Sequence, residues 1–321
     1  MPSAADRSCH DAAPILKVTG LAKRFAGGGG ISAVSLSAPA GSITAFIGVN
    51  GAGKTTTLRC IIGLLEPDAG QISLFGNTSR RAARHRIGFL PEERGLFLHE
   101  RARDTVAFYG RLQGLPRREA CARADLLLDR VGLAHKRNDR LATLSKGNVQ
   151  RVQILCALVH EPELLLLDEP LSGLDLIAQA EMMSLLAEFQ SRGGAVLFST
   201  HTMATAEAVC DRVVILSEGR TVFEGALAEA SALAPHGAVV VTTDGAGLAA
   251  AAAAVGGRAH PVAGVGEAER WRVVLPREVT HPALIRMFAE RGVPIMAFEP
   301  IKPGLEGAFW QVAAHTESRA A

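Results

Sequence analysis

The stretch GVNGAGKTT, Gly48–Thr56, matches the phosphate-binding pattern G-x-x-x-x-G-K-[ST]. It follows the apolar run SITAFIG and leads into TTTLRCIIGLL, so the loop lies between a predicted strand and a predicted helix, as the pattern requires. Glycines allow backbone N–H groups to converge on an anion, and the N-terminus of the following helix adds partial positive charge. This context disfavours a chance glycine-rich turn, and the stretch therefore predicts a nucleotide site.

The residues of this loop have distinct expected roles in binding ATP. Lys54 is expected to reach the β- and γ-phosphates, and the Thr55 hydroxyl is expected to ligate Mg²⁺. Backbone N–H groups along the loop are expected to hold the phosphates. The residues predicted to contact the nucleotide here are Gly48, Val49, Asn50, Gly51, Ala52, Gly53, Lys54, Thr55 and Thr56.

Two adjacent carboxylates, Asp168 and Glu169, end the apolar run LLLLDEP. Four consecutive Leu residues between polar neighbours favour a strand that is buried on both faces of a parallel sheet. At the C-terminal edge of such a strand beside the glycine loop, Asp168 is placed to hold Mg²⁺, often through water, and Glu169 to polarise the attacking water as a general base. The alternative is a solvated strand end, and the presence of a phosphate loop favours the metal-and-base interpretation.

A single histidine, His201, closes the next apolar run, GAVLFSTH. A lone histidine in this position is more often a capped, buried residue than a catalytic one. A strand adjacent to the LLLLDEP strand would nevertheless bring His201 near the γ-phosphate. We therefore predict that His201 is catalytic together with Glu169.

The amino-acid composition disfavours some classes of binding partner and indicates the cellular compartment of the protein. The formal net charge of the 321 residues is +2, which argues against duplex DNA or another nucleic acid as a partner. The five cysteines are scattered and form no C-x-x-C pair, as is typical of a reducing cytosol without structural zinc. The N-terminus lacks the apolar stretch of a secretory signal, and no run reaches the roughly 18 to 20 apolar residues of a membrane span. The chain is therefore expected not to cross a bilayer by itself.

Shifts in pattern along the chain predict its domain organisation. Residues 1–13 are small and polar and are expected to form a disordered tail, and residues 14–226 are expected to form the nucleotide-binding domain. From about residue 92 to 158, apolar residues recur at helical spacing, which predicts a helical subdomain. Residues 227–313 predict a small β-α-β-α-β accessory domain, and 314–321 a loose tail.

Further motifs complete a set that resembles the nucleotide-binding subunit of a bacterial ABC transporter. They are LSKGNVQR from Leu144 and SGLD at Ser172–Asp175, in the expected order with the loop, the acid pair and His201. The resemblance covers about residues 14–226 and implies an α/β P-loop NTPase fold. This fold has a mixed and largely parallel sheet, an antiparallel N-terminal sheet and an inserted helical subdomain, followed here by a small α+β C-terminal domain. It also places Phe25 where an aromatic ring stacks on adenine.

In this family two ATPase subunits meet head to tail, and the signature loop of one covers the γ-phosphate bound by the other. The resemblance thus implies a homodimer or a pair with a second ATPase subunit, with Ser145, Gly147 and Asp175 at the shared site. A capping serine at a helix start is the ordinary alternative for Ser145, with the helix expected from about Asn148. An integral membrane permease is expected to dock on the helical subdomain. That places the chain in the cytoplasm, peripherally on the inner face of the cell membrane.

Three positions depart from the usual family pattern. Lys146 and Asn148 replace Gly and Gln of LSGGQ, and Glu92 stands where the loop that senses metal and permease usually has Gln. Glu92 is still expected to bind Mg²⁺, with a changed local charge. Together with the C-terminal domain, these changes resemble a bacterial subgroup that includes sodium-export ATPase subunits, and this likeness favours export.

Two other function classes compete with an energy-coupling transport subunit. A soluble ATPase of the same type acting on ribosomes or DNA would usually carry two nucleotide domains, long coiled coils or zinc motifs, and this sequence has none of them. The near-neutral charge also disfavours nucleic acid. A regulator that uses ATP-driven dimerisation only as a switch is the third class.

Overall fold

The computed structural model describes residues 14–320 except 78, 94, 266–267 and 302–303. The predicted tail at 1–13 lies outside the described residues. The chain divides into two compact units between Ala226 and Leu227, and each unit is described below by itself. Among the described helices, none combines the length and apolar composition needed to cross a bilayer.

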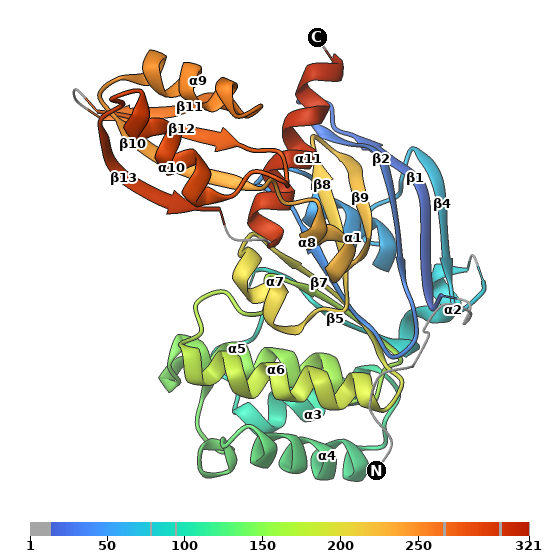
Figure 1. Ribbon diagram of the computed structural model, residues 1–321. Coiled ribbons are helices and arrows are strands. Elements are labelled where there is room, and N and C mark those ends of the chain that lie inside the picture. Colours follow the sequence, from blue (N-terminus) through green and yellow to red (C-terminus); the bar gives the residue numbers. More distant parts are fainter. Residues whose placement is uncertain (1–13, 78, 94, 266–267, 302–303, 321) are drawn as a thin grey trace, which may run out of the picture. The chain divides into compact units, whose positions relative to one another are not determined.

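The described part of the first unit is built on one nine-stranded sheet with the order β4-β1-β2-β9-β8-β3-β7-β6-β5 (Figure 1). The expected antiparallel N-terminal strands, β1, β2 and β4, form one end of this sheet. They join the largely parallel half through β9, which pairs with β2 at Ala33 and Arg220. The strands are β1 (Leu16–Arg24), β2 (Gly30–Ala38), β3 (Ile43–Ile47), β4 (Ala69–Leu74), β5 (Ile87–Leu90), β6 (Leu164–Asp168), β7 (Ala195–Thr200), β8 (Arg212–Ser217) and β9 (Arg220–Ala226).

The parallel half places three chain segments at one edge of the sheet. Strand β7 pairs in parallel with both β3 and β6, so the carboxyl ends of these three strands meet. All five residues of β3 and of β6 are buried, as continuous apolar runs in a parallel sheet require. The acid pair therefore lies one strand further from the glycine loop than expected, because β7 separates β6 from β3.

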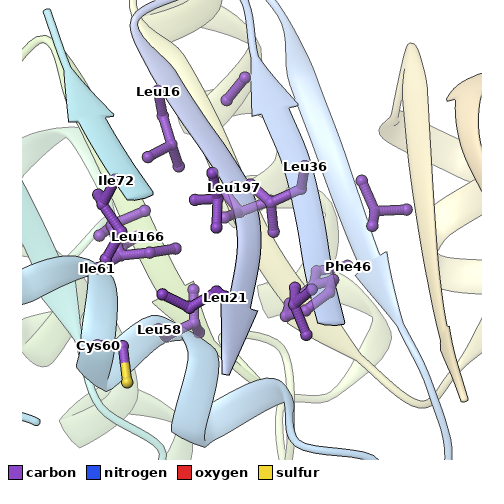
Figure 2. Close-up of a cluster of buried hydrophobic side chains, with 14 of the residues drawn as sticks. Leu16, Leu21, Leu36, Phe46, Leu58, Cys60, Ile61, Ile72, Leu166 and Leu197 are labelled. Atoms are coloured by element: carbon purple, nitrogen blue, oxygen red, sulfur yellow. The ribbon is translucent and has the colours of Figure 1, made fainter. Parts of the chain in front are cut away.

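One hydrophobic core holds the glycine-loop helix, α1 (Lys54–Ile62), between the two halves of the sheet (Figure 2). Leu58 and Ile61 of α1 are fully buried in it together with Leu21 from the antiparallel strands and Phe46 from the parallel strands. Each fully buried side chain of this size contributes about 1.5–3 kcal/mol relative to exposure. Packing from both sides thus fixes the helix that carries the phosphate loop.

The helical subdomain has a core of its own, formed by α3, α4 and α5. The chain then returns to the parallel strands through α6 and α7. The helices of this unit beyond α1 are α2 (Arg80–Ala83), α3 (Ala102–Leu112), α4 (Arg117–Arg130), α5 (Lys146–Leu158), α6 (Leu176–Ser191) and α7 (Met203–Val209), with short 3-10 turns at Arg84–Arg86, Ala134–Lys136 and Leu141–Thr143.

The second unit contains a four-stranded antiparallel sheet with the order β11-β12-β10-β13. Helices α9 and α10 pack their apolar residues on one face of this sheet. The connection β-α-β-β-α-β is that of a split βαβ motif. The elements are α8 (Leu227–Ala232), β10 (Gly237–Thr242), α9 (Gly245–Ala254), β11 (Arg258–Val265), β12 (Ala268–Val274), α10 (His281–Glu290), β13 (Ile295–Pro300) and α11 (Leu305–Ala320).

Two expectations for this unit were wrong. The predicted β-α-β-α-β order lacks helices α8 and α11 and strand β11, whose sequence RAHPVAGV contains Pro261 and small residues that weaken a strand signal. Such a strand is tolerated at the edge of a sheet, which is where β11 lies. The predicted loose tail at 314–321 is also wrong up to residue 320, since α11 extends to Ala320. Its Ala, Glu and Arg residues favour helix, a propensity that outweighs the polar appearance of the segment.

Candidate functional site

The phosphate loop joins β3 to α1 through a backbone that only glycine allows at two positions. Gly53 is the N-cap of α1 with a φ of 105°, and a Cβ added there would lie 2.3 Å from Ile31 Cγ2. A Cβ at Gly48 would lie 2.8 Å from the Leu216 carbonyl oxygen. The remaining loop residues, Val49 to Ala52, form the turn that precedes α1, and Thr55 and Thr56 lie in the first turn of the helix.

Lys54 is buried at the centre of the loop. Its Nζ donates hydrogen bonds to the carbonyl oxygens of Gly48 at 2.8 Å and Val49 at 3.4 Å. It also lies 3.9 Å from Glu169 Oε1. Burial lowers the pKa of Lys54, and the negative charges of Glu169, Asp168 and Glu92 oppose that shift. The glycine loop and the acid pair therefore form one electrostatic site.

The acid pair is fixed by Ser199, a residue that the sequence did not single out. Asp168 is 1% exposed, and its Oδ1 accepts a hydrogen bond from Ser199 Oγ at 2.5 Å. The same Ser199 Oγ accepts one from the backbone N–H of Glu169 at 3.0 Å. Asp168 and Ser199 are paired across β6 and β7, and Ser199 shares a strand face with His201 two residues later. Because Ser199 lies two residues before His201, this spacing could have identified Ser199 from the sequence.

Glu169 leaves the strand in a left-handed backbone conformation, with a φ of 50°. This conformation costs a non-glycine residue about 1–3 kcal/mol and persists where the surroundings impose it. Here it directs the carboxylate towards His201, whose Nδ1 lies 2.9 Å from Glu169 Oε1. His201 is half exposed and lies at the end of β7, the strand adjacent to the acid pair, as expected.

Removing the Ser199 hydroxyl is expected to slow ATP turnover without weakening ATP binding. In Ser199→Ala the Glu169 N–H and the Asp168 carboxylate lose their shared partner, and misplacement of a catalytic group by about 1 Å costs on the order of 100-fold in rate. Turnover and nucleotide affinity should be measured separately. Thr44→Val is the matched control, because it also removes a buried strand hydroxyl, one with no hydrogen-bond partner among the described residues. Normal turnover of Ser199→Ala would contradict a positioning role.

The signature loop caps a helix elsewhere in the first unit. Helix α5 begins at Lys146, two residues before the expected start, and Ser145 Oγ accepts a hydrogen bond from the Asn148 N–H at 3.3 Å. Ser145 is thus an ordinary N-cap within its own chain. The buried Gln150 donates to the Pro170 carbonyl oxygen at 3.2 Å and ties α5 to the acid pair. Among the described residues, no hydrogen bond or ion pair links Ser145 or Gly147 to the glycine loop.

Asp175 caps α6 beside an exposed apolar surface. Its Oδ1 accepts a hydrogen bond from the Ala178 N–H at 2.8 Å. The next two residues, Leu176 and Ile177, are 84% and 73% exposed, which is unusual for side chains of this size. A cavity of about 410 Å³ is lined by Glu169, His201 and Leu176 among others, so this surface reaches the acid pair.

Two further predicted site residues are exposed. Phe25, in the loop between β1 and β2, is 43% exposed. Glu92 lies after β5 and is exposed, yet its charge acts on Lys54. The described residues contain no cluster of three or more His, Cys, Asp or Glu side chains that could hold a metal ion. The residues predicted to bind Mg²⁺, which are Thr55, Glu92 and Asp168, offer one hydroxyl and two carboxylates as ligands.

Comparison with known proteins reveals clear relatives. A family model described as ABC transporter matches residues 31–172. The uncharacterized ABC transporter ATP-binding protein YhaQ of Bacillus subtilis is 37% identical over 215 residues, which cover 67% of this chain and 72% of that protein. The Nod factor export ATP-binding protein I of Burkholderia lata is 38% identical over 207 residues, covering 64% and 68%. A solved ATP-binding subunit of an ABC transporter superimposes with a TM-score of 0.63 at 33% identity, covering 68% of this chain and 92% of that one.

Proposed function

The chain belongs to the family of ABC transporter ATP-binding proteins, and we propose that it binds and hydrolyses ATP to power an exporter. The observation that carries this proposal is the convergence on Glu169 of Lys54 from the phosphate loop and His201 from β7, at 3.9 Å and 2.9 Å. The same carboxylate thus lies beside the group that binds the γ-phosphate and beside a histidine. Export is favoured because a relative is described as an export ATP-binding protein.

In this proposal, different side chains of the chain have different roles in ATP hydrolysis. Lys54 exchanges its hydrogen bonds with the loop carbonyls for bonds to the β- and γ-phosphates. Glu169 accepts a proton from the attacking water, and His201 holds the Glu169 carboxylate and contacts the γ-phosphate. Phe25 stacks on the adenine ring.

The acid pair suits a divalent cation. The buried Asp168 and the 10%-exposed Glu169 face one buried ammonium group, that of Lys54, so the protein side of the site has excess negative charge. ATP adds further negative charge, and oxygen ligands are what Mg²⁺ prefers, usually with water and phosphate completing the shell. We therefore assign Thr55, Asp168 and Glu92 to hold Mg²⁺, which when bound neutralises charge on the β- and γ-phosphates.

The proposed unit of hydrolysis is a head-to-tail dimer of two copies, or of this chain with a second ATPase subunit. Ser145 and Gly147 would cover the γ-phosphate of the partner, with the N-terminus of α5 aimed at it. The exposed Leu176 and Ile177 beside Asp175 support burial of this surface in a complex. ATP thereby joins the subunits, and loss of the γ-phosphate releases them.

An integral membrane permease is the proposed partner of the helical subdomain, at the inner face of the cell membrane. A cavity of about 600 Å³ there is lined by Phe97, Arg103, Phe108 and Arg111 among others. Phe97 and Phe108 are 66% and 42% exposed. Exposed aromatic rings beside arginines are the composition that interface cores favour, and the groove suits an amphipathic cytoplasmic helix of the permease.

The transport assignment is tested by co-expressing the chain with a candidate integral membrane permease and co-purifying the two from membranes. ATP turnover is expected to rise when the permease is present. Phe97→Ala is expected to lose permease binding while keeping ATP affinity, since Phe97 lines the groove of the helical subdomain and is not among the residues assigned to the nucleotide. Leu64→Ala, which truncates an equally exposed apolar residue at 63%, is the control. Recovery only in the ribosomal fraction would contradict a role in transport.

A further inference from the structure

Helices α9 and α10 cover one face of the four-stranded sheet in the second unit, and they leave the opposite face uncovered. The apolar residues that pack on α9 and α10 are Ala238, Val240 and Val273. Because strand residues alternate between faces, Val239, Arg270 and Arg272 lie on the opposite face. The register agrees: Arg272 is opposite Val239, and Val239 is opposite Glu299 on the far side.

This opposite face carries two arginines whose charges are incompletely paired. Arg270 Nη2 lies 3.6 Å from Glu299 Oε2, beyond hydrogen-bond distance, and Glu299 is 75% exposed, so solvent screens that pair. Arg272 forms no ion pair with a carboxylate among the described residues. Arg258 and His260, exposed on β11 on the same face, add to its basic character, His260 being opposite Arg272.

An aromatic ring completes a pocket beside these arginines. Trp310 of α11 is 45% exposed, and the Arg272 guanidinium carbon lies 5.9 Å from its ring centroid. Trp310, Arg270, Arg272, Val239 and Ile301 line a cavity of about 400 Å³, and the carboxylates of Glu299 and Glu306 belong to the same lining. Small-molecule sites typically measure about 300–1,000 Å³ and combine apolar walls with a few charged groups.

We propose that this pocket binds a small anion that carries one flat ring, such as an aromatic carboxylate or a mononucleotide. The guanidinium groups of Arg270 and Arg272 bind the carboxylate or phosphate, for which their planar donor arrays are suited. Trp310 stacks on the ring, and Val239 and Ile301 supply the apolar wall. This gives the accessory unit a ligand-binding role that does not depend on the proposed transport function.

The test uses the full chain with Lys54→Ala, which weakens nucleotide binding by the first unit, and Trp271→Phe, which leaves Trp310 as the fluorescent reporter of the second unit. The chain has two tryptophans, so once Trp271 is replaced Trp310 is the remaining tryptophan whose fluorescence is measured. Phenyl phosphate, benzoate and AMP are the ring-bearing anions, inorganic phosphate is the anion without a ring, and benzyl alcohol is the ring without charge. At least one ring-bearing anion is expected to quench Trp310 saturably, and inorganic phosphate and benzyl alcohol to bind at least about tenfold more weakly. The relative affinities of benzoate and the phosphates identify the anionic group.

Arg272→Ala and Arg270→Ala are each expected to weaken binding of that probe by about tenfold or more, since each removes a charge-assisted hydrogen bond. Arg286→Ala, on the helix-covered side of the sheet, removes the same charge and is expected to leave affinity unchanged. Arg272→Lys is expected to restore part of the binding and shows that the site still folds. Absence of saturable quenching by every ring-bearing anion, equal binding of inorganic phosphate, or unchanged affinity in both arginine-to-alanine variants would overturn the proposal.

Discussion

ATP turnover by the Glu169→Gln variant is expected to fall by about 10²- to 10⁴-fold, because the amide cannot accept a proton from the attacking water. ATP binding is expected to persist. The substitution keeps the size of the side chain and its hydrogen bond to His201, and Lys54 and the glycine loop are unchanged. With hydrolysis blocked, the ATP-bound dimer should accumulate. Turnover is measured in the steady state, and the dimer by size-exclusion chromatography with and without Mg²⁺–ATP.

Glu163→Gln provides the matched control for this experiment. Glu163 immediately precedes the same strand, β6, at its opposite end, where it pairs with Arg86 instead of facing the nucleotide site. That variant is expected to hydrolyse ATP at the rate of the unchanged protein. Equal turnover by Glu169→Gln and the unchanged protein would refute the assignment of Glu169 as the base.

Nucleotide affinity is expected to fall by about tenfold or more in the Lys54→Ala variant, because a charged hydrogen-bond donor to phosphate is lost from a buried position. The loss is expected in binding itself, whereas Glu169→Gln loses only turnover. Equilibrium titration with a fluorescent ATP analogue measures this difference. Lys17→Ala, which removes an exposed lysine from β1, controls for the change in net charge. Normal ATP binding by Lys54→Ala would overturn the phosphate role of Lys54.

Local sequence patterns predicted much of the fold of the first unit. Glycine spacing and the flanking apolar runs predicted the strand, loop and helix around Lys54, and four consecutive Leu residues predicted the buried strand before Asp168. Strands β8 and β9 form a hairpin around Glu218 and Gly219, a dipeptide typical of a turn, and both residues have a positive φ, as a tight two-residue turn requires. These features depend on residues close together in the chain.

Features that depend on contacts between residues far apart in the chain could not be predicted from local sequence patterns. The order β3-β7-β6, which separates the acid pair from the glycine loop by one strand, depends on how crossover connections place strands that are remote in sequence. Ser199 acquires its importance only from its register opposite Asp168. Strand β11 and helices α8 and α11 were not predicted, because the local composition of these segments gives a weak signal for regular structure.

In the proposed dimer, each nucleotide is held by the glycine loop of one copy and covered by the signature loop of the other. Lys54→Ala inactivates the first element, and Gly147→Asp inactivates the second by placing bulk and negative charge where the γ-phosphate would lie. A Cβ at Gly147 would meet only Leu174 Cδ2, at 3.5 Å, which is ordinary contact, so this change is expected to leave the fold of the single chain intact. Each variant alone is expected to be inactive.

Mixing the two inactive variants is the direct measurement. In a mixed dimer one site combines the intact glycine loop of the Gly147→Asp copy with the intact signature loop of the Lys54→Ala copy. ATP turnover is expected to return on mixing, with a maximum near equal concentrations of the two variants. A mixture that forms mixed dimers, detected with differently tagged copies, yet remains as inactive as its components would contradict the shared nucleotide site.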